Sequence, residues 1–199
     1  VFPEKIAING DLCRLIGYYL AEGYTNGRDE VAFTFSKKEE DYVDEVIHLA
    51  ASVFGVDHFR VYERNNSKSL EVSLYSKVIV RFFENLFYVR KPYKATTKTI
   101  PDWMLHLPEN LQVELLRGWW RGDHGSTSSA HLMNAMKVIC LRLGIIPSIL
   151  KNITKQEFNK NSHKIGNRII RATHDQYIFS YLAFFEDKYG LQRDSAFKD

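Results

Sequence analysis

The chain is poor in cysteine and has no long apolar run. Its two cysteines, Cys13 and Cys140, lie in apolar helical patterns and match no zinc-binding spacing, so we expect buried, reduced thiols. No segment is long enough to cross a membrane and no signal peptide opens the chain, so no membrane partner is expected. These absences predict a soluble intracellular protein, cytoplasmic in a prokaryote, with an organelle as the alternative.

Composition and charge leave the function open. The 199 residues are 45% hydrophobic and 26% charged, which suits one large domain or two small ones with a real core. A formal net charge of +3 permits a nucleic-acid partner without requiring one.

Two segments, one in each half of the chain, match position by position. They are Leu15-Ile-Gly-Tyr-Tyr-Leu-Ala-Glu-Gly23 and Leu116-Arg-Gly-Trp-Trp-Arg-Gly-Asp-His124, at a spacing of 101 residues. Each is apolar, has small residues four apart and ends in one acid. Small residues at this spacing let two helix backbones pack closely, so we expect an internal duplication with Gly17, Ala21, Gly118 and Gly122 at a helix interface.

The acids that end these segments, Glu22 and Asp123, are poorly placed for an isolated helix. A carboxylate in the last turn faces the negative end of the helix dipole, at a cost of roughly 0.3–1 kcal/mol. Two such acids at matched positions call for a compensating cation. A divalent metal held between the helix ends, with a phosphate opposite, would supply it.

The first half is predicted to run helix, hairpin, helix, hairpin, helix. Asn9 or Asp11 caps the first helix, and Val31, Phe33 and Phe35 face the core from the first hairpin. The other elements are a helix over 38–54 stopped by Gly55, strands near 59–64 and 70–75, and a helix capped by Ser76 that runs to Leu86.

The second half repeats this order after a basic linker with a short helical turn around Trp103. We expect a helix over 130–143, a strand over 147–153, a loop over 154–164, a strand over 167–173 and a helix over 175–185. Gly55 and Gly144 lie 89 positions apart, so the second copy is 12 residues shorter, with only residues 125–129 in place of a hairpin. The units are 1–87, a linker over 88–110, and 111–199.

On these motifs, supported by Leu141-Arg-Leu-Gly-Ile-Ile-Pro-Ser148, the chain resembles the LAGLIDADG homing endonucleases, in particular archaeal intron-encoded or intein-embedded forms. His124 departs from the glycine usual at the last motif position. The resemblance implies an α+β, pseudo-two-fold duplicated αββαββα fold. Its two motif helices would meet at the centre, and its two curved antiparallel sheets would form a saddle for DNA. A chain with both motifs is expected to act as a monomer.

The resemblance also implies a chemistry. Glu22 and Asp123, with Ala21 and Gly122 beside them, would hold Mg²⁺, with Mn²⁺ as a substitute and Ca²⁺ as a non-cleaving one. Both strands of a long asymmetric site in double-stranded DNA would be hydrolysed, leaving short 3′ overhangs. Lys98, in Lys98-Thr99-Ile100-Pro101, matches a family lysine that could orient water or stabilise phosphate charge. Lys91 and Lys94 could share that role, and a solvated linker lysine is the alternative.

Strand parity selects a candidate DNA-binding set, because alternate residues of a strand share a face. Arginine can pair with guanine, although a single exposed arginine is more often a solubilising charge. Arg168 and Arg171 fall on opposite faces of an unbroken strand. The set is Arg28, Thr34, Arg60, Tyr62, Arg64, Glu71, Ser73, Lys151, Arg168 and Arg171.

Other functions remain open at this point. An RNA maturase would use the same fold on its host intron RNA, and a non-cleaving DNA-binding regulator would not need both acids. A complete intein would need an N-terminal splicing nucleophile and a terminal His-Asn pair, which the sequence does not show. A two-carboxylate glycosidase would work without a divalent ion.

Overall fold

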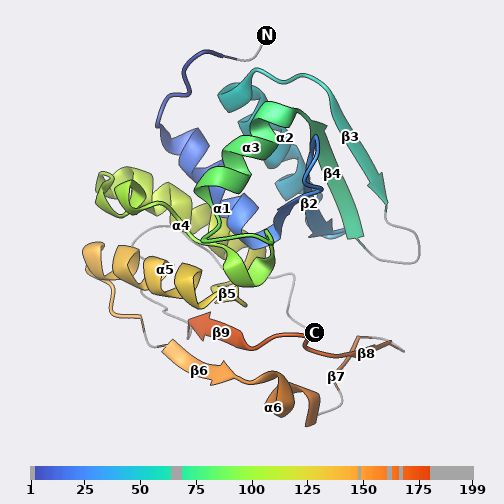
Figure 1. Ribbon diagram of the computed structural model, residues 1–199, viewed down its shortest axis with the longest axis vertical. Helices are drawn as coiled ribbons and strands as arrows, with labels where there is room; N and C mark the ends of the chain where they lie inside the picture. The colour runs from blue at the N-terminus through green and yellow to red at the C-terminus, as the bar shows by residue number, and fades with distance from the viewer. Residues whose placement is uncertain (1–2, 64–68, 148, 161–162, 166–167, 180–199) are drawn as a thin grey trace.

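The computed structural model describes residues 3–63, 69–147, 149–160, 163–165 and 168–179 as helices, strands and connections (Figure 1). No helix in these ranges is long and apolar enough to cross a membrane. The helices are α1 (Gly10–Glu22), α2 (Glu40–Phe54), α3 (Lys77–Leu86), α4 (Glu109–Asp123), α5 (Ala130–Arg142) and α6 (Lys155–Lys160). The strands are β1 (Gly23–Thr25), β2 (Glu30–Ser36), β3 (Phe59–Glu63), β4 (Ser69–Tyr75), β5 (Ser126–Thr127), β6 (Ile149–Ile153), β7 (His163–Ile165), β8 (Arg168–Ile170) and β9 (Gln176–Phe179).

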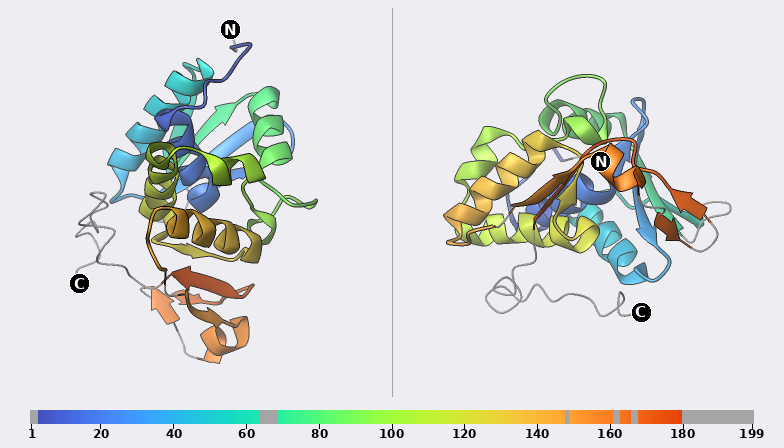
Figure 2. Two further views of the ribbon diagram at one scale, coloured as in Figure 1. Left: turned by 90° about the vertical axis from the view of Figure 1, so that its left-hand side faces the viewer. Right: turned by 90° about the horizontal axis from the view of Figure 1, so that it is seen from below.

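The paired helices α1 and α4 form the centre of the molecule, with one sheet on each side of the pair (Figures 1 and 2). The first sheet has the strand order β1-β2-β4-β3, and the second has the order β5-β9-β6. All pairs in both sheets are antiparallel. The predicted α+β fold with antiparallel sheets beside two central motif helices is therefore confirmed.

The first half forms as its sequence predicts, because its local signals agree with its packing. The Asn9 side chain accepts a hydrogen bond from the Leu12 amide at 3.0 Å, and Ser76 caps α3 in the same way through Ile79. Gly55 ends α2 at φ +64°, a conformation that favours glycine. The side chains of Val31, Phe33 and Phe35 are buried under α2 and α3, as the alternation in β2 predicts.

The second half differs from the prediction in three places. The expected loop over 154–164 contains α6 and the start of β7, and the strand expected over 167–173 extends only over Arg168–Ile170. Residues 176–179, expected to be helical, form β9, which pairs with both β5 and β6. Residues beyond 179 lie outside the described part of the chain.

The missing 12 residues explain the smaller second sheet. Only β5, a two-residue strand, follows α4, where β1 and a full β2 follow α1. Strand β9 then pairs directly with β5, and β7 and β8 form a separate two-stranded ribbon.

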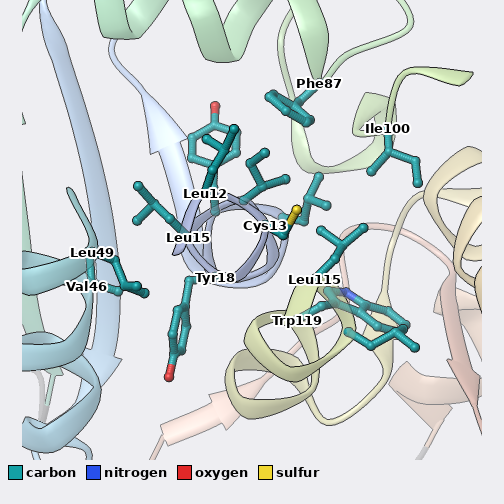
Figure 3. Close-up of a cluster of buried hydrophobic side chains, with 14 of the residues drawn as sticks. Leu12, Cys13, Leu15, Tyr18, Val46, Leu49, Phe87, Ile100, Leu115 and Trp119 are labelled. Carbon is teal, nitrogen blue, oxygen red and sulfur yellow. The ribbon is translucent and has the colours of Figure 1, made fainter. Parts of the chain in front are cut away.

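One hydrophobic core joins the halves through the central helices. Tyr18, Tyr19, Trp119 and Trp120, the aromatic pairs of the two motifs, are all buried. Figure 3 looks along α1 and shows its side chains directed to all sides, with Leu115 and Trp119 of α4 packed near Cys13. Both cysteines are buried free thiols, and burial raises the pKa of each to about 12. The motif helices therefore belong to the hydrophobic core along most of their length.

Candidate active site at the ends of the paired helices

The two central helices approach each other backbone to backbone. A Cβ atom built on Gly17 would lie 2.3 Å from the Leu115 carbonyl oxygen, and one on Gly118 would lie 2.1 Å from that of Arg14. One turn further on, a Cβ on Gly122 would lie 2.4 Å from the Cβ of Ala21. No side chain larger than hydrogen fits at these glycines, so the small residues of the two motifs set how closely the helices approach.

This close packing brings Glu22 and Asp123 together, because each is the last residue of its helix. A Cβ on Gly122, next to Asp123, would lie 3.2 Å from the Cγ of Glu22. Burial raises the pKa of Glu22 to about 8, and the negative charge of Asp123 adds to the rise. Burial also raises the pKa of Asp123, to about 6. The two acids thus share one poorly solvated site in which holding both negative charges is costly.

The side chain of Lys98 enters this site from the linker. Its Nζ atom donates hydrogen bonds to the carbonyl oxygens of Tyr19 at 2.8 Å, Leu20 at 3.0 Å and Gly23 at 2.7 Å. These carbonyls lie in the last turn of α1 and at its C-cap, where few backbone donors remain, although the Tyr19 oxygen also accepts from the Gly23 amide. Lys98 is 5% exposed; burial lowers its pKa to about 8, and the charges of Asp123 and Glu22 oppose that fall. The lysine therefore caps α1 and partly balances the two acids.

The backbone of the linker fixes Lys98 in place. Residue 98 forms a β-bridge with Tyr88, and its carbonyl oxygen accepts a hydrogen bond from Ser129 Oγ at 2.6 Å. Ser129 in turn caps α5, so the lysine connects the end of α1 to the start of α5. The other two candidate lysines, Lys91 and Lys94, are exposed, and neither makes these contacts. Of the three, only Lys98 lies at the end of α1.

The two helix ends are closed differently. Gly23 is extended, at φ −85°, and starts β1, and a Cβ on it would lie 2.3 Å from the Tyr19 ring. On α4, His124 itself adopts the left-handed conformation at φ +47°, followed by Gly125 at φ +79°. The departure at the last motif position thus moves the left-handed cap onto a histidine directly beside Asp123.

The donor set of the site fits a hard divalent ion. Within the described ranges no group of three or more histidine, cysteine, aspartate or glutamate side chains could hold a metal. The site offers two carboxylates, with Ala21 and Gly122 among the last carbonyls of their helices. Mg²⁺, Mn²⁺ and Ca²⁺ accept such oxygen ligands and complete their shells with water and phosphate oxygens. The residues fit this kind of ion and do not form a closed structural metal site.

The sequence does not predict the ion-pair network that joins α1, α2 and α4. Glu45 of α2 accepts hydrogen bonds from Arg14 at 2.7 Å, Tyr18 at 2.5 Å and Arg121 at 2.5 Å. These partners hold the pKa of Glu45 below its usual value, against the opposing effect of burial. On α4, Glu114 accepts from Arg14 and Arg117. The signal in the sequence that could have predicted this network is the presence of charged residues, such as Arg14 and Arg117, within the apolar patterns of α1 and α4.

The candidate DNA-binding residues of the first half occupy one face of the first sheet. Register places Thr34 and Tyr62 opposite Glu71, and Arg60 opposite Ser73, on the face away from α2 and α3. Glu71 and Ser73 are buried, at 2% and 0% exposure, which corrects the expectation that their side chains lie open to a ligand. The Tyr62 ring and the Arg60 guanidinium lie over this face, 5.1 Å apart.

The remaining candidates are less well defined. Arg28 is exposed in the turn between β1 and β2. Arg171 is exposed and follows the end of β8, so it is not part of a strand as expected. Arg64 and the side chains of Lys151 and Arg168 lie outside the described part of the structure.

Comparison with solved structures identifies the architecture. Mesophilic variants of the homing endonuclease I-DmoI match with a TM-score of 0.57 at 11% sequence identity, over 94% of this chain and 98% of theirs. Complexes of I-DmoI with DNA and Ca, and with DNA and Mn, each match with a TM-score of 0.54. This chain has the homing-endonuclease fold. At this identity the likeness establishes the fold alone.

Sequence comparison gives relatives that are much longer than this chain. The uncharacterized protein MJ0043 of Methanocaldococcus jannaschii is 36% identical over 172 residues, which cover 86% of this chain and 21% of that protein. The DNA polymerase II large subunit of Thermococcus kodakarensis is 29% identical over 128 residues, which cover 64% of this chain and 7% of that protein. The chain thus spans about a fifth or less of these relatives, and no protein-family profile matches it.

Proposed function

We propose that the chain is a site-specific endonuclease that cuts both strands of double-stranded DNA with divalent metal ions. The observation that carries the proposal is the meeting of Glu22 and Asp123 at the ends of two helices whose backbones pack closely at Gly17 and Gly118. The homing-endonuclease fold supports DNA as the substrate, since its solved neighbours include complexes with DNA, Ca and Mn.

The raised pKa values of the two acids make the binding of a cation dependent on pH. Around neutral pH, burial and mutual repulsion favour a proton on Glu22. A divalent cation would supply the positive charge that stabilises both carboxylates and the charge that develops on the scissile phosphate. Glu22 would release its proton when the cation is bound, so the site is expected to load best above neutral pH.

The two acids and Lys98 have different roles in the proposed hydrolysis. A water molecule loses a proton to solvent as its oxygen bonds to phosphorus, the bond from phosphorus to the leaving strand-end oxygen breaks, and that oxygen takes up a proton from solvent. The carboxylates of Glu22 and Asp123, which meet at the interface of the two helices, would orient the attacking water molecule and the phosphate. Lys98 holds the end of α1 through three carbonyl oxygens and so fixes where the Glu22 carboxylate lies.

The lengths of the relatives favour a nuclease segment that is inserted within longer host proteins. Parts of this chain match a DNA polymerase subunit, a replication factor C small subunit, an iron–sulfur cluster assembly protein and a DNA helicase, each over 7–15% of its length. A segment shared by proteins with such different names does not provide their named activities. We propose that it is a mobile nuclease unit carried within host proteins, as in an intein, and that this chain belongs to that kind.

Cleavage-site selection on a randomised duplex library tests the function directly. In Mg²⁺ the chain is expected to recover one long asymmetric site, cut in both strands with short 3′ overhangs. In Ca²⁺ it should retain the same site uncut. Retention of a site without cutting in either ion would make the chain a DNA-binding regulator, and enrichment of RNA alone would make it an RNA-binding splicing cofactor.

A further inference from the structure

Three side chains from three strands form a row on the face of the first sheet that points away from α2 and α3. Thr34 of β2 and Tyr62 of β3 each lie directly opposite Glu71 of β4. The Tyr62 hydroxyl donates a hydrogen bond to Glu71 Oε1, and the Thr34 hydroxyl donates to Glu71 Oε2 at 3.4 Å. Both hydroxyl protons are therefore directed at one carboxylate.

The burial of this row determines which atoms face outward. Glu71 is 2% exposed, whereas Tyr62 and Thr34 are partly exposed. A hydroxyl carries one proton and two acceptor lone pairs, so a hydroxyl that donates inward can only accept on its outer side. The hydrogen bond to Glu71 also raises the pKa of Tyr62, so the phenol keeps its proton.

We propose that Tyr62 determines base specificity by accepting a hydrogen bond from an amino group in the major groove. In that groove only adenine N6 and cytosine N4 offer amino donors, whereas guanine O6 and thymine O4 are acceptors and would face the Tyr62 oxygen with no proton between. Tyr62 thus selects adenine or cytosine at the base it contacts, and Glu71 is a positioning residue that sets the polarity of its hydroxyl. This inference rests on the proposed action on DNA.

The neighbouring arginine has the opposite chemistry. Arg60, two residues before Tyr62 on the same strand face, lies with its guanidinium 5.1 Å from the centre of the Tyr62 ring. A guanidinium has donors only and pairs with guanine O6 and N7. Strand β3 therefore presents an acceptor and a donor side by side, a pattern that fits an adenine or cytosine next to a guanine.

The test compares the DNA sites selected by the wild type, Tyr62→Phe and Glu71→Gln, with Tyr93→Phe in the linker as the matched control. The wild type is expected to require adenine or cytosine at one position, and Tyr62→Phe to lose that requirement while every other position stays the same. In Glu71→Gln the amide can donate to the tyrosine, so the Tyr62 proton can turn outward and guanine or thymine should become acceptable there. Tyr93→Phe should select the wild-type site.

A base analogue gives a second readout on the selected duplex. If the selected base is adenine, replacing it by purine removes only the amino group. This should weaken wild-type binding by about three- to tenfold, the effect of one neutral hydrogen bond, and leave Tyr62→Phe unchanged. If the base is cytosine, the analogue without the 4-amino group serves in the same way.

The possible failures are distinguishable. A selected site with no position that depends on Tyr62, or an analogue that weakens both proteins equally, would overturn this inference and leave the nuclease intact. A Glu71→Gln variant that keeps the adenine or cytosine preference would overturn the role of Glu71. Failure of the wild type to enrich any DNA sequence would overturn the proposed function and this inference together.

Discussion

The Nζ atom of Lys98 lies 2.7 Å from the carbonyl oxygen of Gly23, the residue directly after Glu22. Two further hydrogen bonds, to the carbonyls of Tyr19 and Leu20, use the remaining protons of the ammonium group. A linker lysine therefore closes the helix that carries one of the two acids. Its charge lies where the helix dipole and two carboxylates all favour a cation.

This arrangement predicts that Lys98 stabilises the protein even without metal or DNA. Lys98→Met removes the ammonium hydrogen bonds from three carbonyls and the lysine charge from beside two acids, and is expected to lower the free energy of unfolding by about 3 kcal/mol. Thermal unfolding of the metal-free protein measures this loss. Lys91→Met, in the exposed part of the same linker, is the control and should unfold like the wild type. Equal stabilities of Lys98→Met and the control would show that the lysine does not cap α1.

The pKa of Glu22 predicts how stability depends on pH. Its folded value of about 8 lies above the ordinary glutamate value of 4.5, so the folded state holds the proton more tightly than the unfolded state. The stability from this group is complete below pH about 4.5 and is lost as the pH rises towards 8. Asp123, raised from 3.8 to about 6, acts with the same sign over a lower range.

The test is the melting temperature of the metal-free protein across this pH range. The wild type should melt progressively lower from pH 5 to pH 8, and Glu22→Gln, which cannot ionise, should show a much weaker decline. Lys98 has the opposite effect at higher pH, because its folded pKa of about 8 lies below 10.5 and stability then rises with pH. Parallel curves for the wild type and Glu22→Gln would contradict the shifted acid.

The central helix interface predicts strong effects of single methyl groups. Gly17→Ala and Gly118→Ala each place a Cβ within 2.3 Å of a backbone oxygen of the facing helix, so the helices must separate. We expect each substitution to lower the free energy of unfolding by about 3 kcal/mol, although alanine has the better helix propensity. Gly10→Ala on α1 is the control, since its Cβ would make only ordinary contact at 3.4 Å. Chemical denaturation of the three variants measures the difference, and equal stabilities would contradict the close packing.

The Glu45 network predicts a positioning effect on cleavage. Glu45→Ala leaves Arg14, Tyr18 and Arg121 without their shared acceptor, with an expected loss of about 2 kcal/mol in the free energy of unfolding. If the network sets the register of the two helices, the cleavage rate should fall more than the affinity for the selected duplex. The neighbouring exposed residue gives the control, Asp44→Ala, which should change neither. A Glu45→Ala variant that is destabilised but cuts at the normal rate would limit the network to a structural role.

The parts predicted well from the sequence are those where local pattern and tertiary packing agree. Alternation in β2, the caps at Asn9 and Ser76 and the left-handed Gly55 are local signals, and each forms as predicted. The repeat also predicts that Gly17 and Gly118 allow the two helices to pack closely, because equivalent positions of a duplicated segment occupy equivalent places in the fold. The helix predicted over residues 176–179 is wrong, and so short an apolar run does not distinguish the helical period from the strand period. Their pairing with β5 and β6 depends on distant residues and decides the outcome.

The candidate site was predictable only in part for a similar reason. The motif ends pointed to Glu22 and Asp123, but no pattern in the linker shows that the Lys98 ammonium group meets three carbonyls of α1. Strand parity placed Glu71 on the face away from α2 and α3 and still missed its burial, because its contact with Tyr62 comes from another strand.

The most direct test of the account is single-turnover cleavage of the selected duplex with each strand labelled separately. The wild type is expected to cut both strands in Mg²⁺ and neither in Ca²⁺, and Glu22→Gln and Asp123→Asn to lose cleavage by at least about a thousandfold while still binding the duplex. Cleavage that persists in a metal chelator, or at the wild-type rate in both acid variants, would contradict a metal-dependent site at the ends of the paired helices.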